Sequence, residues 1–216
     1  MFVPVRASVG STVDLYLFDF DKTLYAFDFR KRLPALSRMS GVSQYHLAKT
    51  WWAAGYEERA ELGEWKTADA YLDKFAEVTG ARITLDQWCE ARHEASTPNE
   101  GVIAALRLAA TLGTVSLFSN NPAPFEATLS RMAPDVTAIL GGNILISCEL
   151  GLRKPDPASY IAAINYYDAR ATNTYFIDDS ASNIAGAVEA GLTTFHYTDE
   201  ADVPALDAGI RAFAAR

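Results

Sequence analysis

The sequence predicts an α/β protein with a doubly wound, mostly parallel sheet and a small inserted all-helical domain. A short apolar run at 13–18 reads as a strand, helices alone fill about 27–97, and strands then alternate with helices. Strands that alternate with helices of this length imply parallel βαβ units and a sheet covered on both faces. The first strand therefore belongs to a Rossmann-like sheet that is completed only after the insertion. We expect 1–25 and 98–216 to form this core and 26–97 to form a cap.

Composition limits the classes of function. The chain has 216 residues and a formal charge of −8, which argues against nonspecific nucleic-acid binding, since that needs a basic surface. No apolar run approaches the ~18 residues of a membrane span, and the first residues lack the pattern of a signal peptide. Cys89 and Cys148 are far apart in sequence and are expected to be buried, reduced thiols of a cytoplasmic protein.

The first strand ends in two carboxylates. Residues 1–12 read as a loose lead-in, and the short apolar run that follows is typical of a buried strand. Asp19 and Asp21 come next, and they would share one side of the strand if it continued through both. The alternative is that they are turn residues that close the strand.

The insertion reads as helices without a convincing strand. We expect helices at 30–39, at 44–54 with Ser43 as N-cap, from Thr67 to a stop at Gly80, and at 85–95 with Thr84 as N-cap. Large aromatic side chains are expected mainly to build the core of this domain, with one or two lining a substrate pocket: Tyr45, Trp51, Trp52, Tyr56 and Trp65.

In the remainder of the chain, segments with the hydrophobic pattern of a helix alternate with segments that have the pattern of a strand. Helices are expected at 101–112, 124–132, 157–167, 181–190 and 203–215, and strands at 114–118, 174–177 and 193–196. Two shorter strand candidates, 138–140 and 144–147, flank Gly141 and Gly142.

Polar residues follow the strands of this sheet. Because the carboxyl ends of parallel strands meet at one edge, we expect one cluster there, made of Asp19, Asp21, Ser119, Asn120, Lys154, Asp178, Asp179 and Asn183. Carboxylates gathered at one edge require a divalent cation, and hard oxygen ligands favour Mg²⁺. A lysine among them suits a phosphate, and the whole set suits phosphoryl transfer. Taken singly, each motif also fits an ordinary turn, loop or helix N-cap.

Four stretches carry a family resemblance: FDFDKTL at 18–24, FSN at 118–120, GLRKPD at 151–156 and FIDDS at 176–180. In this order they resemble the four motifs of the haloacid dehalogenase superfamily, and the insertion is similar to its C1 cap. The resemblance covers about 13–200, and its texture is closest to the branch of α-glucose-1-phosphate phosphatase and the N-terminal phosphatase domain of soluble epoxide hydrolase. Lys22 is a departure, because the family most often has Gly there.

The resemblance implies a Mg²⁺-dependent phosphatase that hydrolyses a small phosphorylated metabolite, preferably a sugar phosphate, through an aspartyl-phosphate. Asp19 would be the nucleophile and Asp21 the general acid and then base, with the transferring group bound by Ser119, Asn120, Arg153 and Lys154. The metal would be held by Asp19, the backbone carbonyl of Asp21 and Asp179, with Asp178 behind them or bound through water. Lys22 would change the loop that follows or add positive charge near the phosphate.

Other functions stay open at this stage. A phosphomutase would use the same first step, and an inactive binding or regulatory module would keep the fold. A haloacid dehalogenase is disfavoured, because displacement of chloride needs no acid such as Asp21 and no metal. The expected partner is a small-molecule phosphate ester, not nucleic acid or a membrane, and both a monomer and a homodimer are compatible with the sequence.

Overall fold

A computed structural model describes residues 13–216, so the predicted lead-in at 1–12 lies outside the described residues. The main sheet has the order β5-β4-β1-β6-β7, and every neighbouring pair is parallel. Its strands are β1 (Leu15–Phe18), β4 (Thr114–Ser119), β5 (Ile144–Ile146), β6 (Thr174–Asp178) and β7 (Thr193–His196). The predicted α/β class with a mostly parallel sheet is confirmed, and β1 lies at its centre.

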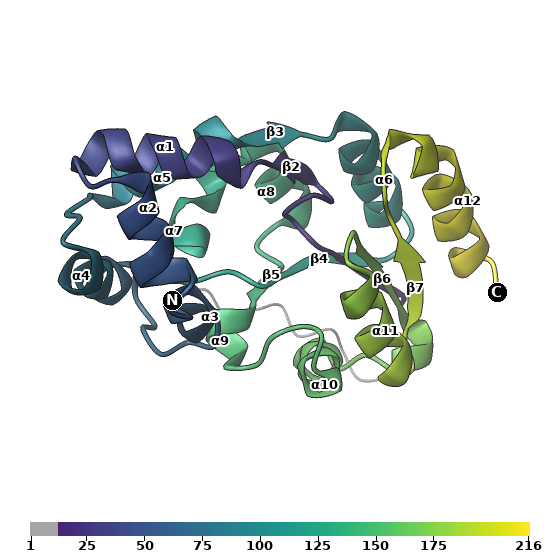
Figure 1. Ribbon diagram of the computed structural model, residues 1–216. Coiled ribbons are helices and arrows are strands. Elements are labelled where there is room, and N and C mark those ends of the chain that lie inside the picture. The colour runs from purple at the N-terminus through teal and green to yellow at the C-terminus, as the bar shows by residue number, and fades with distance from the viewer. Residues whose placement is uncertain (1–12) are drawn as a thin grey trace.

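Side chains of β1 alternate between two hydrophobic cores, as the period of a strand requires. Tyr16 and Phe18 belong to the core shared with α6 (Glu100–Ala110), α7 (Ala123–Met132), α8 (Pro134–Leu140) and α12 (Val203–Ala214). Leu15 and Leu17 belong to the core shared with α10 (Pro157–Tyr166) and α11 (Ala181–Glu189). All four residues are at most 1% exposed. The sheet is therefore covered on both faces, and Figure 1 shows α10 and α11 on the side opposite to α6 and α12.

The helices that cover the sheet follow the predicted alternation. They are α6 (Glu100–Ala110), α7 (Ala123–Met132), α8 (Pro134–Leu140), α9 (Ser147–Leu150), α10 (Pro157–Tyr166), α11 (Ala181–Glu189) and α12 (Val203–Ala214). The strand expected at 138–140 is wrong, because these residues end α8. Pro134 is the first residue of that helix, where proline is favoured, and Gly141 ends it in the left-handed conformation.

The helical insertion between β1 and α6 consists of α1 (Phe29–Ser40), α2 (Gln44–Leu47), a π-helical segment (Ala48–Trp52), α3 (Tyr56–Glu61), α4 (Ala68–Thr79) and α5 (Leu85–Ala95). Ser43, Thr67 and Thr84 each accept a hydrogen bond from a backbone N–H of the first turn, and Thr84 completes a capping box with Gln87. The predicted helices at 30–39, 68–79 and 85–95 are confirmed, the one expected at 44–54 is a short α-helix followed by the π-helical segment, and α3 was not predicted. Helices α4 and α5 pack against α7, so the insertion lies on the core.

Two short strands at the base of the insertion correct the expectation that this stretch contains none. β2 (Tyr25–Phe27) pairs antiparallel with β3 (Ser96–Pro98), with Tyr25 opposite Pro98. These strands were not predicted because three residues are too few to show an alternating pattern, and because proline is found in strands only at a sheet edge or a strand end. The pair brings the two ends of the insertion together; the exact division into core and cap stays our prediction.

The interior of the insertion is aromatic, as predicted. The fully buried Trp51 ring lies 5.0–5.8 Å from the rings of Tyr56, Trp65, Tyr71 and Phe75. Tyr45, in contrast, is 75% exposed and takes no part in this core. Cys89 and Cys148 are buried and free, and among residues 13–216 no helix has the length and apolar character needed to cross a membrane.

Candidate active site

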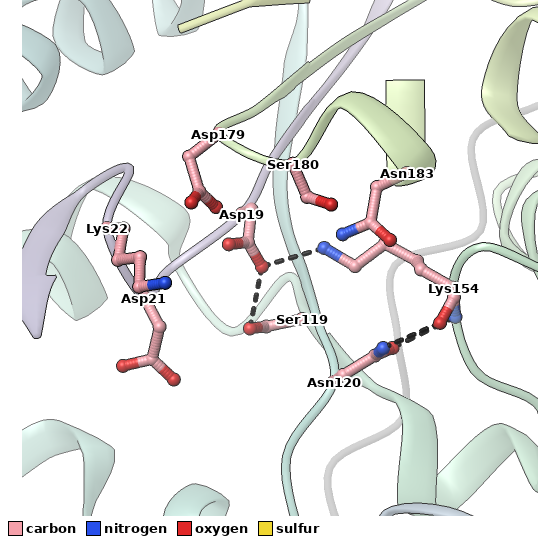
Figure 2. Close-up of a pocket in the computed structure, with 9 residues that line it drawn as sticks. All are labelled: Asp19, Asp21, Lys22, Ser119, Asn120, Lys154, Asp179, Ser180 and Asn183. Carbon is pink, nitrogen blue, oxygen red and sulfur yellow. Dashed lines mark hydrogen bonds and ion pairs between the residues drawn. The ribbon is translucent and has the colours of Figure 1, made fainter. Parts of the chain in front are cut away.

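Polar side chains at the ends of β1, β4 and β6 converge with Lys154, from the loop after α9, and Asn183, from α11, on one cavity of about 200 Å³. Asp19 directly follows β1, and its backbone N–H bonds to the carbonyl of Ile177 (3.0 Å), which fixes it at the sheet edge. Figure 2 shows the lining residues, which are Asp19, Asp21, Lys22, Ser119, Asn120, Lys154, Asp179, Ser180 and Asn183. The structure thus places most of the predicted site residues around one space.

Lys154 is the central cation of the site. Its side chain is 1% exposed, and Nζ donates to Asp19 Oδ1 (2.7 Å), Asp178 Oδ2 (2.6 Å) and the carbonyl of Phe118 (2.9 Å). Burial alone would lower the pKa of Lys154, but the charges of Asp178 and Asp19 raise it above its ordinary value. The lysine therefore stays protonated and holds two carboxylates together.

Asn120 contacts the backbone of this lysine at both ends of its amide. Its Oδ1 accepts from the Lys154 N–H (3.0 Å) and its Nδ2 donates to the Lys154 carbonyl (2.8 Å). In Figure 2 the amide faces this backbone. Asn120 thus positions the lysine loop, whereas Ser119 contacts Asp19 directly, because its Oγ donates to Asp19 Oδ1 (2.8 Å).

Three carboxylates form a set of oxygen donors suited to a divalent cation. One oxygen each of Asp19, Asp178 and Asp179 lies within 4.8 Å of the others. Asp178 is held by Lys154, by the Ser180 N–H (2.8 Å) and by Asn183 Nδ2 (3.0 Å), so its oxygens are already engaged. Asp179 is aimed into the cavity, and its carbonyl contacts His196 Nε2 (2.8 Å). Hard oxygens at this spacing fit Mg²⁺.

Crowding of these acids changes their proton affinity. Burial raises the pKa of Asp19 to about 7; the charge of Asp178 adds to this rise, and Lys154 opposes it. Burial also raises the pKa of Asp179, again with a contribution from Asp178, while Lys22 and Lys154 oppose that rise. A bound cation would favour the ionised form of both groups.

Asp21 does not join this carboxylate cluster, which corrects the expectation of four acids at one edge. The strand ends at Phe18, and a turn in which Tyr25 N–H bonds to the Phe20 carbonyl (2.9 Å) redirects the chain. The Asp21 carboxylate instead accepts from Nη2 of Arg92 at 2.8 and 3.0 Å. Figure 2 shows it pointing away from Asp19 and Asp179. The predicted shared face required a strand that the turn interrupts.

Arg153, which we expected at the phosphate, does not line the cavity. Its guanidinium pairs with Glu58 (2.7 Å) and Glu61 (2.8 Å) of α3. Arg153 directly precedes Lys154, but its guanidinium contacts α3 whereas the Lys154 side chain enters the buried site. Arg153 thus joins the core to the insertion.

Three residues near the site were missed from the sequence. Asn121, which is 3% exposed, donates through Nδ2 to Ser119 Oγ (3.1 Å), and its place directly after the Ser-Asn pair is a signal that points to it. His196, the last residue of β7, contacts the Asp179 carbonyl through Nε2 (2.8 Å). Arg92 gives no local signal, because an arginine on a helix ordinarily faces solvent.

Comparison with known proteins agrees with this geometry. Residues 13–191 match the family of haloacid dehalogenase-like hydrolases, so the chain belongs to that family and is a hydrolase by membership. A sesquiterpene phosphatase, AstK, of Aspergillus oryzae is 33% identical over 85 residues, which are 39% of this chain and 42% of that protein. The chain therefore matches less than half of the length of this relative.

Solved structures share the fold at low sequence identity. A predicted HAD-like family hydrolase from Porphyromonas gingivalis superposes with a TM-score of 0.73 at 17% identity, covering 93% of this chain and 99% of the other. A HAD family enzyme from Bacteroides thetaiotaomicron, crystallised with magnesium and inorganic phosphate, gives 0.70 at 19% identity over 85% and 93%. A 2-haloacid dehalogenase from Pseudomonas syringae gives 0.63 at 18% identity over 91% and 99%.

Proposed function

We propose that this hydrolase is a Mg²⁺-dependent phosphatase that cleaves a small phosphorylated metabolite through an aspartyl-phosphate. The observation that carries the proposal is the setting of Asp19. Ser119 and Lys154 hydrogen-bond to the same oxygen, Oδ1, at 2.8 and 2.7 Å, in a cavity that Asp179 also lines. One oxygen of the nucleophile is thus held while the carboxylate faces the space where a phosphate fits.

The residues divide the reaction between them. A carboxylate oxygen of Asp19 attacks phosphorus as the bond to the leaving oxygen breaks, and Asp21 supplies the proton that this oxygen takes up. Asp21 then accepts a proton from the water that attacks phosphorus and releases Asp19. Lys154 and Ser119 stabilise charge on the transferring group. Mg²⁺ held by Asp19, Asp179 and the backbone carbonyl of Asp21 would offset the charge of the phosphate oxygens.

Several features support a small substrate. The cavity of about 200 Å³ suits a phosphate with a compact leaving group, and we propose that the helical insertion is a cap that selects it. A sugar phosphate stays our preferred class, and the sesquiterpene phosphatase relative adds an isoprenoid phosphate as a second class to assay. The two buried free cysteines support our placement in the cytoplasm.

Substitution of the nucleophile tests the proposal. Asp19→Asn should lower hydrolysis of p-nitrophenyl phosphate with Mg²⁺ by at least about 10³-fold, since the amide cannot form the intermediate. Asp73→Asn, at an exposed position of α4, is the control and should retain wild-type activity. Wild-type turnover by Asp19→Asn would overturn the proposal.

Two related activities can be separated by their products. A phosphomutase would return the phosphoryl group to the sugar, so an isomerised phosphate ester would replace free phosphate. A dehalogenase would release chloride from 2-chloropropionate without metal. Asp21 in the cavity wall and the set of three acids made of Asp19, Asp178 and Asp179 favour phosphoryl transfer over both halide displacement and a role as an inactive binding module.

A further inference from the structure

Two buried arginines lie within the helical insertion, and one of them, Arg92, contacts Asp21 of the cavity wall. Arg32 of α1 is 3% exposed and Arg92 of α5 is 2% exposed. Both guanidinium groups lie over the ring of Trp88, at 5.1 and 5.8 Å from its centroid. Two like charges this close and this deeply buried are costly unless each has an acceptor or an anion.

Within the described part of the chain, Arg32 has an ion-pair partner in Glu57, but two of its nitrogens have no hydrogen-bond acceptor. Its Nε and Nη2 are buried and make no hydrogen bond. The nearest carboxylate oxygen, Glu57 Oε1, is 3.7 Å from Nη1, and the other oxygen of Glu57 accepts from Trp51 and Tyr71. Burial lowers the pKa of Arg32, the Glu57 charge opposes this, and the charge of Arg92 lowers it further. Buried donors left without acceptors in a charged group point to a missing anion.

Arg92 connects this pair to the cavity. Its Nη2 donates to both oxygens of Asp21, at 2.8 and 3.0 Å, and Asp21 is part of the cavity wall. Its Nε is buried without a partner. Arg92 therefore lies directly behind Asp21, whose carboxylate is its anionic partner, and Arg32 lies near Arg92 at the shared Trp88 ring.

This contact holds Asp21 away from the place where it is needed. With both oxygens on Arg92, the carboxyl group points away from Asp19, as Figure 2 shows, and cannot face the leaving oxygen. An oxyanion on the substrate would offer Arg92 another acceptor and leave Asp21 free to turn. Guanidinium groups suit this task, because their paired donors match carboxylate and phosphate.

We propose that Arg32 and Arg92 form an oxyanion subsite for the leaving group. The preferred substrates are then phosphate monoesters that carry a second phosphate or a carboxylate. The inference rests on the phosphatase function proposed above and assigns its substrate class. A site with buried donors discriminates strongly against an analogue that lacks the acceptor, because the donors then stay unpaired.

Matched substrate pairs test the subsite. We expect kcat/KM to be at least about 30-fold higher for 3-phosphoglycerate than for glycerol 3-phosphate, or for fructose 1,6-bisphosphate than for fructose 6-phosphate. A preference within the first pair would indicate that the subsite binds a carboxylate, and a preference within the second that it binds a phosphate. Equal kcat/KM within both pairs would overturn the subsite while hydrolysis itself leaves the phosphatase function intact.

Variants then locate the preference. Arg92→Met and Arg32→Met should bring the ratio within each pair close to one, mainly by raising KM for the anionic member. Arg131→Met is the matched control. Arg131 of α7 forms an ion pair with Asp86 of α5, so it too pairs with an aspartate, but its side chain is 54% exposed. This variant should keep the wild-type ratio. An unchanged ratio in folded Arg92→Met would contradict the proposal. If Arg92→Met does not fold, Arg92→Lys, which keeps the charge and loses the paired donors, should still lower the ratio.

Binding without turnover separates the two proposals. Titration calorimetry of Asp19→Asn with 3-phosphoglycerate and with glycerol 3-phosphate measures the subsite alone. If Asp19→Asn binds 3-phosphoglycerate more tightly than glycerol 3-phosphate, the subsite is supported. If the wild-type protein then hydrolyses no phosphate ester, the phosphatase function is refuted although the subsite stands. Equal binding of both probes, with fructose 1,6-bisphosphate no tighter than fructose 6-phosphate, would refute the subsite.

Discussion

Lys154 shows how one buried side chain serves both stability and chemistry. It is the shared partner of Asp19 and Asp178, at 2.7 and 2.6 Å, and all three side chains are at most 9% exposed. Removing one member of a buried ion group leaves the others uncompensated, which typically costs about 3–5 kcal/mol.

Lys154→Met should therefore destabilise the protein by about 3 kcal/mol or more in the absence of metal and lower kcat/KM by at least about 10³-fold. Urea denaturation and p-nitrophenyl phosphate hydrolysis measure the two effects. The double variant Lys154→Met, Asp178→Asn should recover part of the stability but not the activity. A single variant as stable as the wild type would contradict the role of Lys154 as the central counterion.

Lys22 occupies a backbone conformation that glycine prefers. Its φ is 64°, and Asp168, with φ of 51°, is the other non-glycine residue with positive φ among residues 13–216. This region costs a residue with a Cβ about 1 kcal/mol relative to glycine. Lys22 lines the cavity, and its charge opposes the rise of the Asp179 pKa, so we infer that the lysine is kept for its charge.

Lys22→Gly should raise the free energy of unfolding by about 1 kcal/mol while raising KM for phosphate esters roughly 10-fold. Asp168→Gly is the matched control: it should stabilise the protein similarly and leave KM unchanged. Thermal unfolding and steady-state kinetics measure both. If Lys22→Gly kept the wild-type KM, the lysine would have no part in binding phosphate.

Residues at strand ends were predictable to the extent that the strand fixes the direction of the side chain. Asp19 and Ser119 lie where parallel β1 and β4 end, so the sequence pattern brought them to one cavity. Asp21 and Arg153 lie beyond their strands, in turns whose geometry no periodicity encodes. Arg92 was unpredictable for another reason, since its partner is 71 residues away in the sequence.

At the scale of elements, helix α3 joins the insertion to the core through acidic side chains. Burial raises the pKa of Glu61 from 4.5 to about 7; the Glu57 charge adds to this rise, and Arg153 opposes it. A carboxyl group whose pKa is higher in the folded state stabilises the fold below its unfolded pKa, and that stability is lost as pH rises through the folded pKa. The loss therefore falls between about pH 4.5 and 7 and amounts to at most about 3 kcal/mol.

Glu61→Gln should remove this loss, so the variant gains stability relative to the wild type as pH rises from 4.5 to 8. Asp19 and Glu126, whose pKa values are also raised to about 7, stay in both proteins, so the difference isolates Glu61. Glu58→Gln, which changes the more exposed partner of the same Arg153, is the control. Parallel stability curves for wild type and Glu61→Gln would show that Glu61 titrates normally.

Element prediction succeeded where a helix carries its own start and stop signals. Thr84 and Gln87 specify the start of α5, and Gly80 ends α4 in the left-handed conformation. It failed for β2 and β3, which exist because the two ends of the insertion meet, and for 138–140, where a short apolar run suits a helix and a strand equally.

For the whole molecule, the order of the strands explains why the chemistry gathers in one place. β1 lies between β4 and β6, so the residues after these three neighbours meet at one sheet edge. The insertion between β1 and α6 contacts this part of the core through the ion pairs of Arg92 with Asp21 and of Glu61 with Arg153. The sequence motifs predicted the edge, whereas contacts between the insertion and the core required the folded structure. We therefore expect the core to supply the reaction and the insertion to select the substrate.

Detection of the covalent intermediate tests the central claim most directly. p-Nitrophenolate leaves without a proton, so Asp21→Asn should still form the aspartyl-phosphate from p-nitrophenyl phosphate and then hydrolyse it slowly. Acid quenching in the first turnover and peptide mass spectrometry should find one phosphoryl group on Asp19. Phosphate release with no phosphorylated peptide, or with the phosphoryl group on another residue, would contradict the assignment of Asp19 as the nucleophile.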